Sequence, residues 1–355
     1  MTYKVSVVVP VYNAEKYLKE AIYSVISQTI GFDNIQLLLC DDCSTDSSYS
    51  ICRQYAKKYN NIVALQTETN SGAAGAPRNL CLSKVEAPYI MFLDSDDKLL
   101  PNACELLYET IDEGNYDLVT GSYLELHYNK KVRNTRQHES ATGRDYLIPD
   151  EATELRNCVI PFWTKIYRTQ IIQEKGILFG NFTIGEDTVF ANQYLAFCKK
   201  CRNINEPVYI YRIRNDSLSR GLSFRNLKDV IEGDEIIKDT LLANGLEDYW
   251  KHFITDHVSD YCNLLANSEI SDDELSEAVT MWFPMLNEAS VTGIPPKTPY
   301  AEILFDDMAH GDLEATIKHM LSLKRICSSK NQFAQEILLS RGWQLITRIN
   351  QLLGK

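Results

Sequence analysis

The sequence lacks the two best-known phosphate-binding signatures. It contains no Walker A sequence, and no GxGxxG follows the first predicted strand, because Gly72 and Gly75 come only after the third. Glycine-rich turns of these kinds hold phosphate groups at fixed positions in their folds. Their absence excludes P-loop ATPases and dinucleotide-dependent dehydrogenases, and it excludes kinases as well.

Positive charge and long apolar runs are also missing. The formal net charge is −12, whereas a nucleic-acid-binding protein normally presents a basic face. No uninterrupted apolar run approaches the roughly 20 residues that span a bilayer. Nothing at the start resembles a signal peptide, since an apolar strand over Val5–Val9 begins almost at once. We therefore expect a cytoplasmic protein without a nucleic-acid partner.

The ten cysteines show no disulfide framework. They are scattered along the chain, which agrees with a reducing compartment. Two CxxC pairs occur, Cys40 with Cys43 and Cys198 with Cys201, but the pairs lie far apart and in different kinds of segment. A shared zinc site would need both pairs to meet, so we expect buried or surface thiols instead.

The sequence does contain an alternation of strand and helix patterns over its first 120 residues. Alternation of this kind predicts a mostly parallel sheet covered by helices, an α/β fold. The whole chain of 355 residues is long enough for two domains or for one domain with a large extension. The predicted strands are Val5–Val9, Ile35–Cys40, Ile62–Gln66, Tyr89–Leu93 and Leu118–Thr120, and the predicted helices are Ala14–Gln28, Asp46–Tyr59, Pro77–Lys84 and Asn102–Glu113.

Polar residues follow the predicted strands at the point where each strand ends. Ligands of such sheets bind beyond the carboxyl ends of the strands. An aromatic ring there could cover a base, a carboxylate could accept from a base N–H or a ribose hydroxyl, and Arg78 could reach phosphate or base oxygens. The sequence therefore predicts a nucleotide-diphosphate cleft, and the alternative is four unrelated polar turns. The segments that meet at this edge include Tyr12, Asp42, Asn70–Asn79 and Asp94–Asp97.

The stretch Asp94-Ser95-Asp96-Asp97 directly follows the apolar run Tyr89–Leu93, which predicts a buried strand. Three carboxylates at the end of such a strand lie at the edge of a core, where unpaired charge is costly. Mg²⁺ or Mn²⁺ offsets that cost, because these cations take oxygen ligands and share them with phosphates. The stretch alone is also compatible with an ordinary turn, but beside the other polar turns it predicts a cation site.

Together, five motifs resemble those of the inverting family 2 glycosyltransferases of the GT-A fold. The resemblance covers about residues 3–220, and the order and the spacing of the motifs both match. Cys43 departs from the family pattern where glycine is usual, and Pro77 departs where alanine is commoner. The proline variant resembles that of bacterial enzymes that decorate wall polymers and capsules. The motifs are Val5–Asn13, Asp41–Asp46, Asn70–Gly72 with Pro77–Asn79, Asp94–Asp97 and Gly185–Phe190.

The resemblance implies a role for each matching residue. Asp96 would be the direct ligand of Mn²⁺ or Mg²⁺ and would bridge it to the donor diphosphate, Asp187 would be the general base, and Glu186 belongs to the same acceptor-side pair. Some family members place a metal-binding histidine after the base. No histidine lies between His138 and His252, so water and phosphate oxygens would complete the coordination. The implied donor-binding residues are Pro10, Tyr12, Asn13, Asp42, Arg78, Asp94 and Ser95.

The chemistry of such an enzyme needs one base on the acceptor side. Sugar transfer from a nucleotide diphosphate passes through an oxocarbenium-like transition state, and one carboxylate must take the proton of the attacking hydroxyl. A single displacement of this kind inverts the anomeric centre. Phe190, Tyr194 and Leu195 follow at helical spacing, so Asp187 opens a predicted helix, whose dipole stabilises a carboxylate by about 0.3–1 kcal/mol. The alternative is an ordinary N-terminal helix residue.

Further candidates lie on the acceptor side and near the diphosphate. Trp163 could stack on a sugar face or pack in the core. Lys165 could contact phosphate or acceptor, although an ordinary solvated lysine is the favoured alternative. Alternation from Tyr209 to Ile213 predicts a strand whose polar end closes over the diphosphate. The residues at that end are Arg212, Arg214, Ser217 and Ser219.

The chain changes character after about residue 224. We expect a GT-A domain over residues 1–224, with a nucleotide-sugar half over 1–120 and an acceptor half over 121–224, and a helical region over 225–355. Residues 337–353 predict an amphipathic helix, in a tail that carries six basic residues and one acidic residue from Met320 onward. Such a helix can pack on its own domain, form a homo-oligomer or lie at the inner face of an anionic membrane. Membrane contact would suit a lipid-linked acceptor.

The sequence thus predicts a metal-dependent inverting glycosyltransferase of polysaccharide biosynthesis, either a hexosyl- or an N-acetylhexosaminyltransferase. UDP is the commonest nucleotide in the family, so a UDP-sugar is the expected donor. The expected acceptor is a hydroxyl of a glycan, wall polymer, lipid-linked or glycoprotein substrate. The alternative is a non-catalytic scaffold or partner subunit of an active transferase. That alternative predicts loss of Asp96, Asp187 or the pocket at the first strand, and all three are present.

Overall fold

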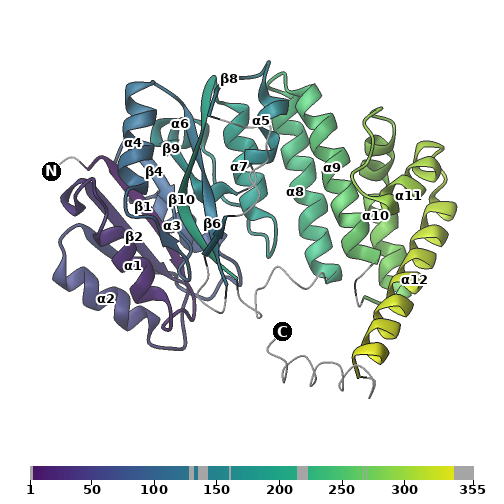
Figure 1. Ribbon diagram of the computed structural model, residues 1–355, viewed down its shortest axis with the longest axis horizontal. Helices are drawn as coiled ribbons and strands as arrows, with labels where there is room; N and C mark the ends of the chain where they lie inside the picture. The colour runs from purple at the N-terminus through teal and green to yellow at the C-terminus, as the bar shows by residue number, and fades with distance from the viewer. Residues whose placement is uncertain are drawn as a thin grey trace, which may run out of the picture. The chain divides into compact units, whose positions relative to one another are not determined.

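The computed structural model describes residues 3–127, 132–134, 143–159, 161–213, 223–266, 268 and 270–339 (Figure 1). Strands and helices alternate over the first part of the chain, and long helices follow. The strands are β1 Val5–Val11, β2 Ile35–Asp41, β3 Ile62–Gln66, β4 Tyr89–Phe92, β5 Lys98–Leu99, β6 Leu118–Leu126, β7 Val132–Asn134, β8 Asp145–Leu147, β9 Lys165–Arg168 and β10 Lys200–Arg212. The helices are α1 Leu18–Ile26, α2 Ser48–Lys58, α3 Gly75–Leu82, α4 Ala103–Glu113, α5 Ala152–Val159, α6 Thr169–Lys175, α7 Glu186–Ala196, α8 Phe224–Leu242, α9 Glu247–Ala266, α10 Asp272–Ser290, α11 Pro299–Ala309 and α12 Leu313–Leu339.

Ten strands of the described chain form one mixed sheet, whose main path runs β3-β2-β1-β4-β9-β6-β10-β5. β1 pairs in parallel with β2 and β4, and β2 pairs in parallel with β3. β9 lies antiparallel between β4 and β6, and β10 runs parallel to β6. The carboxyl ends of β1, β2 and β4 therefore meet at one edge, where Val11 lies opposite Asp41.

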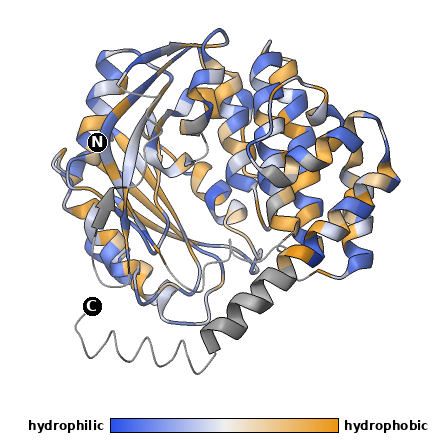
Figure 2. Ribbon diagram, turned by 45° about the vertical axis from the view of Figure 1, so that its right-hand side comes forward, coloured by the Kyte–Doolittle hydropathy of each residue, from blue (hydrophilic) through white to orange (hydrophobic). Residues whose placement is uncertain are grey.

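Helices cover both faces of the sheet, so β1 and β2 are buried along their whole length (Figure 2). Side chains alternate between the two faces of a strand. On one face, α1, α2 and α4 pack on an aliphatic core that includes Val7, Leu37 and Leu107. On the other face, the ring of Phe92 contacts four aromatic rings at centroid distances of 5.3–5.5 Å. Those rings belong to Phe162, Tyr167, Phe179 and Phe190.

All ten cysteines are free. Cys40, Cys198 and Cys201 are buried, and Cys43 is half-buried. Among the residues that the structure describes, no group of three or more His, Cys, Asp or Glu side chains could hold a metal ion. Neither CxxC pair belongs to such a group in the described structure.

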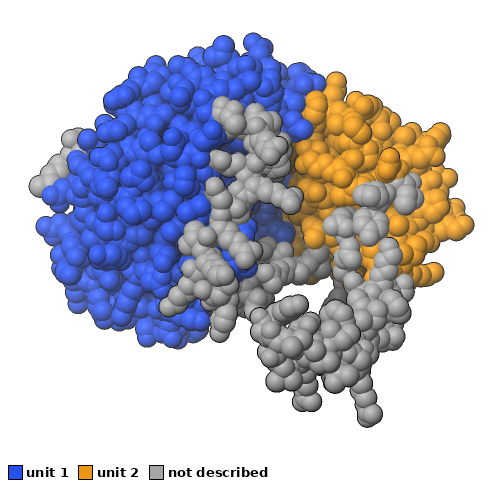
Figure 3. All heavy atoms as spheres, in the orientation of Figure 1, with its two compact units in different colours: residues 1–220, 232–250 blue, residues 221–231, 251–355 orange. Residues whose placement is uncertain are grey.

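The chain divides into two compact units (Figure 3). The first comprises residues 1–220 and 232–250 and holds the sheet, and the second comprises residues 221–231 and 251–355. The boundary expected near residue 224 falls in the first turn of α8, a helix that gives residues to both units.

The second unit is helical, with α10, α11 and α12 packed on one another. Trp282 of α10 is fully buried, and its ring lies 5.6 Å from that of Tyr261 on α9. α10 begins with a capping box formed by Ser271 and Glu274. No helix in the described ranges is both long and apolar enough to cross a bilayer. The amphipathic helix expected over 337–353 lies, beyond Leu339, outside the described residues.

Candidate active site

A pocket opens at the carboxyl edge of the parallel strands, the edge at which such sheets bind ligands. Its volume is about 500 Å³, and its walls come from the ends of β1, β2 and β4 and from the chain around the start of α3. The residues that the sequence assigned to donor and cation binding come together here. They are Pro10, Tyr12, Asn13, Asp42, Arg78, Asp94, Ser95 and Asp96.

The loop after β1 forms one wall of this pocket. Tyr12 is 51% exposed, so its ring is accessible from the pocket that it lines. Asn13 has a left-handed backbone conformation, with φ of 46°, which asparagine tolerates better than most residues. Its side-chain oxygen accepts from the backbone N–H of Thr45 at 2.8 Å, and its own N–H donates to Ser44 Oγ at 2.9 Å. The loops after β1 and β2 are therefore fixed to each other.

Asp42, at the end of β2, holds the chain that leads to α3. Its carboxylate accepts from Thr67 Oγ1 at 2.8 Å, from Ser71 Oγ at 2.9 Å and from the Ser71 N–H at 3.0 Å. A carboxylate offers about four lone-pair sites. Three donors make four contacts with these sites, because the Ser71 N–H also reaches Oδ1 at 3.2 Å. The same side chain lines the pocket.

Two positions beside the pocket depend on the properties of glycine: Cys43, which has a backbone conformation that favours glycine, and Gly75. Cys43 has a φ of 56°, a left-handed conformation that glycine adopts at no steric cost, so the family's usual glycine suits this turn. The Cys43 thiol donates to the Thr67 carbonyl at 3.2 Å. Gly75 is needed for space, because a Cβ there would lie 2.5 Å from the backbone oxygen of Gly180.

Arg78 links the pocket to the acceptor-side acidic pair. It is 4% exposed, and its two terminal nitrogens lie 2.9 Å from Asp94 Oδ1 and 2.9 Å from Glu186 Oε1. Its guanidinium lies over the rings of Phe162 and Phe179, at 4.6 and 5.1 Å from their centroids. A buried cation is costly unless opposite charge compensates it. The two carboxylates and the two rings provide that compensation.

The three carboxylates of the turn Asp94–Asp97, the acidic turn, lie in three different environments. Asp94 pairs with Arg78, and its side chain is 29% exposed. Asp96 lines the pocket. Asp97 is buried and accepts from Tyr209 Oη at 3.0 Å and from the Arg212 N–H at 2.7 Å. Burial, together with the charges of Asp96 and Asp94, raises the pKa of Asp97 well above its usual value.

The pocket fits a cation that is shared with a ligand. No cluster of three metal-binding side chains occurs in the described part of the chain, so the protein alone does not form a closed cage. Mg²⁺ is commonly bound by one or two carboxylates together with substrate phosphates and water. Asp94 and Asp96 both line the pocket and could provide those carboxylates.

Glu186 and Asp187 are the first two residues of α7, as predicted for a helix that begins there. The turn before them depends on Gly185, whose φ is 84°. Asp187 Oδ1 accepts from the N–H of Thr188 at 2.8 Å. Burial is the main cause that raises the pKa of both carboxyls, and the positive charge of Arg78 opposes the rise.

Two acceptor-side candidates are packed inside the protein. Trp163 is half-buried, with its ring 4.2 Å from that of Tyr209 and stacked on that of Tyr211 at 5.5 Å. The expectation of a solvated Lys165 is wrong, because this lysine is 1% exposed. Its ammonium donates to the Pro161 carbonyl at 2.6 Å, and burial lowers its pKa to about 7.

The residues expected to close over the diphosphate divide into two groups. Arg212 is the last residue of β10 and contacts protein atoms: its Nε donates to the Asp96 carbonyl at 2.7 Å and its Nη2 to Glu20 Oε2 at 3.0 Å. The structure does not bring it into the pocket lining. Arg214, Ser217 and Ser219 lie outside the described residues.

Sequence reasoning missed three residues that support the acidic turn, namely Glu20, Asp97 and Tyr209. Asp97 belongs to the acidic motif Asp94–Asp97, so the sequence drew attention to it. Its buried position depends on Tyr209 and Arg212 of β10, more than a hundred residues later in the chain. Glu20 looks like any exposed helical glutamate in the sequence.

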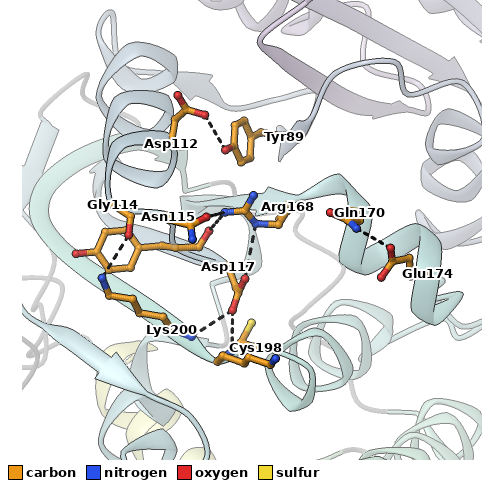
Figure 4. A network of polar contacts seen from close by, with 12 residues as sticks. Tyr89, Asp112, Gly114, Asn115, Asp117, Arg168, Gln170, Glu174, Cys198 and Lys200 are labelled. Atoms are coloured by element: carbon orange, nitrogen blue, oxygen red, sulfur yellow. Dashed lines mark hydrogen bonds and ion pairs between the residues drawn. The ribbon is translucent and has the colours of Figure 1, made fainter.

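A second polar network lies at the amino edge of the sheet, away from the pocket (Figure 4). Asp117, just before β6, accepts from the N–H groups of Lys199 and Lys200 at 2.7 and 3.2 Å. Arg168, at the end of β9, lies 3.6 Å from the other Asp117 oxygen. These contacts join β6, β9 and β10 and involve none of the pocket residues.

Comparison with known proteins agrees with this geometry. Residues 6–181 match the model of the family described as glycosyl transferase family 2. The chain is 31% identical over 307 residues to the minor teichoic acid biosynthesis protein GgaB of Bacillus subtilis. The matched region covers 79% of this chain and 32% of GgaB. It is 29% identical over 290 residues to glycosyltransferase GlyG of Streptococcus pneumoniae, with coverage of 77% and 93%. The chain thus spans about a third of GgaB and nearly all of GlyG.

A solved structure has the same fold. Residues 1–349 of TarS from S. aureus, crystallised with UDP-GlcNAc, match with a TM-score of 0.74 at 21% identity, over 91% of this chain and 92% of that one. The likeness establishes a GT-A fold followed by a helical region. With four of the five family motifs lining one pocket and residues 6–181 matching the family model, this chain belongs to glycosyl transferase family 2.

Proposed function

We propose that this protein is a cation-dependent, inverting glycosyltransferase that moves a sugar from a UDP-sugar to a hydroxyl of a wall polymer or related glycan. The observation that carries the proposal is the pocket, which combines an exposed aromatic ring, a buried carboxylate and an acidic turn in about 500 Å³. The names of GgaB and TarS, a teichoic acid biosynthesis protein and a poly(ribitol-phosphate) N-acetylglucosaminyltransferase, support the acceptor class.

Tyr12 and Asp42 suit a uracil base. The accessible ring of Tyr12 offers an apolar face for stacking. The carboxylate of Asp42 is held by Thr67 and Ser71 and lines the pocket. An ionised carboxylate only accepts hydrogen bonds, and the ring N–H of uracil, which cytosine lacks, is a matching donor.

The acidic turn suits the diphosphate end of the donor. Asp96, with Asp94 beside it, would hold Mn²⁺ or Mg²⁺ together with phosphate oxygens and water. Such an ion would stabilise the negative charge that grows on the leaving diphosphate. Asp94 is at the same time held by Arg78, which fixes the direction of its carboxylate.

The transfer step is a single displacement. The acceptor oxygen forms a bond to the anomeric carbon while the bond from that carbon to the diphosphate oxygen breaks, so UDP leaves and the configuration inverts. Asp187 takes the proton of the attacking hydroxyl. Because burial raises the pKa of Asp187, its carboxylate is a stronger base than an exposed aspartate. Arg78, paired with Glu186, keeps positive charge close to this acidic pair.

Thermal unfolding with a panel of nucleotide sugars, with and without Mn²⁺, tests the donor site. A ligand that binds only the folded protein adds about 2.7 kcal/mol of stability at a hundredfold excess over its Kd. We expect a Mn²⁺-dependent rise of the Tm with a UDP-sugar, lost in Asp96→Ala. Glu174→Ala is the matched control, because this exposed carboxylate of α6 accepts from Gln170 at 2.6 Å and does not line the pocket (Figure 4).

The two results have separate meanings. A shift that persists in Asp96→Ala would contradict the cation role of that residue. If no nucleotide sugar shifts the Tm, the proposed function as a whole is contradicted, and a non-catalytic scaffold or partner subunit is favoured.

A further inference from the structure

The end of strand β10 is bonded to the acidic turn. The Arg212 N–H donates to Asp97 Oδ1 at 2.7 Å, and the Tyr209 hydroxyl donates to Asp97 Oδ2 at 3.0 Å. The same hydroxyl accepts from the Asp94 N–H at 3.1 Å. Tyr209 therefore touches the first and the last residue of the turn Asp94–Asp97, which is itself closed by a bond from the Asp97 N–H to the Asp94 carbonyl at 3.1 Å.

The side chain of Arg212 reaches the middle of the same turn. Its Nε donates to the Asp96 carbonyl at 2.7 Å. Its Nη2 donates to Glu20 Oε2 at 3.0 Å, and its guanidinium lies 4.5 Å from the ring centroid of Tyr17. The side chain is 15% exposed. Hydrogen bonds from a charged donor are shorter and stronger than neutral ones, so this contact holds the backbone of Asp96 firmly.

These contacts connect the two ends of the pocket. Glu20 belongs to α1, the helix that directly follows the wall formed by Tyr12 and Asn13. Asp96 lines the same pocket from the acidic turn. Arg212 thus bonds both to the helix that follows the Tyr12–Asn13 wall and to the backbone of Asp96.

We propose that Tyr209, Asp97 and Arg212 are positioning residues for the donor. They hold the acidic turn so that the Asp96 carboxylate stays at a fixed distance from the wall formed by Tyr12 and Asn13. A nucleotide diphosphate has a fixed span between its base and its phosphates, and a cation ligand must lie at the right point of that span. Arg212 acts in this arrangement through Asp96 and Glu20, and it does not bind the diphosphate itself. The inference rests on the proposed function, namely that the pocket takes a UDP-sugar with a cation.

Tyr209→Phe is the decisive variant. Tyr209 is 0% exposed, so its hydroxyl cannot touch a ligand. Phenylalanine keeps the ring that packs on Trp163 at 4.2 Å and removes only the bonds to Asp97 and Asp94. Arg212→Met is the second variant, because it keeps a long apolar chain while it removes the bonds to Asp96 and Glu20.

Lys98→Met is the matched control. Lys98 donates to the same Glu20 oxygen at 2.9 Å, and within the described residues its ammonium makes no hydrogen bond to the acidic turn. Its removal therefore perturbs Glu20 while it leaves the Asp96 carbonyl bonded to Arg212.

The measurement is the Kd of UDP by titration calorimetry, with and without Mn²⁺, on variants whose circular dichroism and unfolding midpoint show a folded chain. We expect the gain in UDP affinity that Mn²⁺ provides to fall about tenfold in Tyr209→Phe and in Arg212→Met. The Mn²⁺-free Kd should change less than twofold, and Lys98→Met should keep the gain within twofold.

Three results would overturn the inference. An unchanged Mn²⁺ gain in folded Tyr209→Phe would show that the turn does not need this support. A rise of the Mn²⁺-free Kd confined to Arg212→Met would show instead that Arg212 binds the diphosphate directly. A wild-type protein that binds no UDP in either condition would overturn the proposed function, and this inference with it.

Discussion

Replacement of Arg78 by Met should expose how strongly the pocket depends on one buried cation. Arg78 is 4% exposed and bonds at 2.9 Å to both Asp94 and Glu186, whose side chains are 29% and 13% exposed. Removal of one partner of a buried ion pair costs about 3–5 kcal/mol, because an uncompensated charge remains. Since Asp94 keeps some contact with water, we expect a loss near the lower end, about 3 kcal/mol at pH 7.

This loss should depend on pH in a defined direction. The positive charge of Arg78 lowers the pKa of Glu186 and of Asp187 against the larger effect of burial. Without Arg78, both folded-state pKa values rise further. Carboxyls that are protonated need no cation beside them, so the difference in unfolding free energy between wild type and Arg78→Met should shrink as the pH falls from 8 to 5.

Urea unfolding at several pH values measures this difference. Arg144→Met is the matched control, because Arg144 also contacts two carboxylates, those of Glu151 and Glu154 at 3.0 and 2.7 Å, but its side chain is 40% exposed. Exposed pairs contribute about 0–1 kcal/mol. A loss in Arg78→Met no larger than that of the control, or one that is the same at every pH, would refute the reasoning.

Three further predictions concern single residues. Asp187→Asn should lower kcat by about 10²–10⁴-fold and leave the UDP Kd within twofold of the wild-type value, which kinetics and calorimetry check. In the wild-type protein, the acidic limb of the pH profile of kcat should lie above the ordinary pKa of aspartate, because the base must be deprotonated and burial raises the pKa of Asp187. Burial lowers the pKa of Lys165 in the folded protein to about 7, against an ordinary value of 10.5, so the unfolded chain binds more protons between these pH values. The unfolding free energy of the wild type should therefore rise by about 2–4 kcal/mol from pH 7 to 10, and Lys165→Met should lose this rise. The same change of unfolding free energy with pH in both proteins would contradict this prediction. Gly75→Ala should cost about 1–3 kcal/mol in urea unfolding, because its Cβ would lie 2.5 Å from the Gly180 oxygen. Gly233→Ala should cost less, because its Cβ would lie 3.0 Å from a methyl group of the Val189 side chain.

The nucleotide half of the fold could be predicted because its signals are local. The strands over Val5–Val11 and Ile35–Asp41 are mostly apolar and do not alternate between apolar and polar residues, as expected for strands buried on both faces. The rule that ligands bind at the carboxyl ends of parallel strands then brings Tyr12, Asp42 and Asp94 to one edge before any coordinates are known. Each of these steps uses neighbours in the sequence.

Other features depend on contacts that no local pattern contains. β5 has only two residues, Lys98–Leu99, which is too short to show a periodicity. β9 lies antiparallel between β4 and β6, and the strand–helix alternation that predicts parallel strands does not predict this place. Lys165 looks solvated in the sequence, but its strand is covered on both faces. Arg212 looks like a phosphate ligand, but Glu20 and the Asp96 carbonyl are within its reach.

The measurement that tests the central claim most directly is UDP formation and sugar transfer by the wild-type protein, from the UDP-sugar that raises its Tm, onto a poly(ribitol-phosphate) acceptor with Mn²⁺. We expect turnover with inversion at the anomeric carbon, abolished in Asp96→Ala and reduced at least a hundredfold in Asp187→Asn. A bound UDP-sugar with no transfer to any polyol-phosphate or glycan acceptor, or turnover in Asp187→Asn within tenfold of the wild-type rate, would contradict the claim.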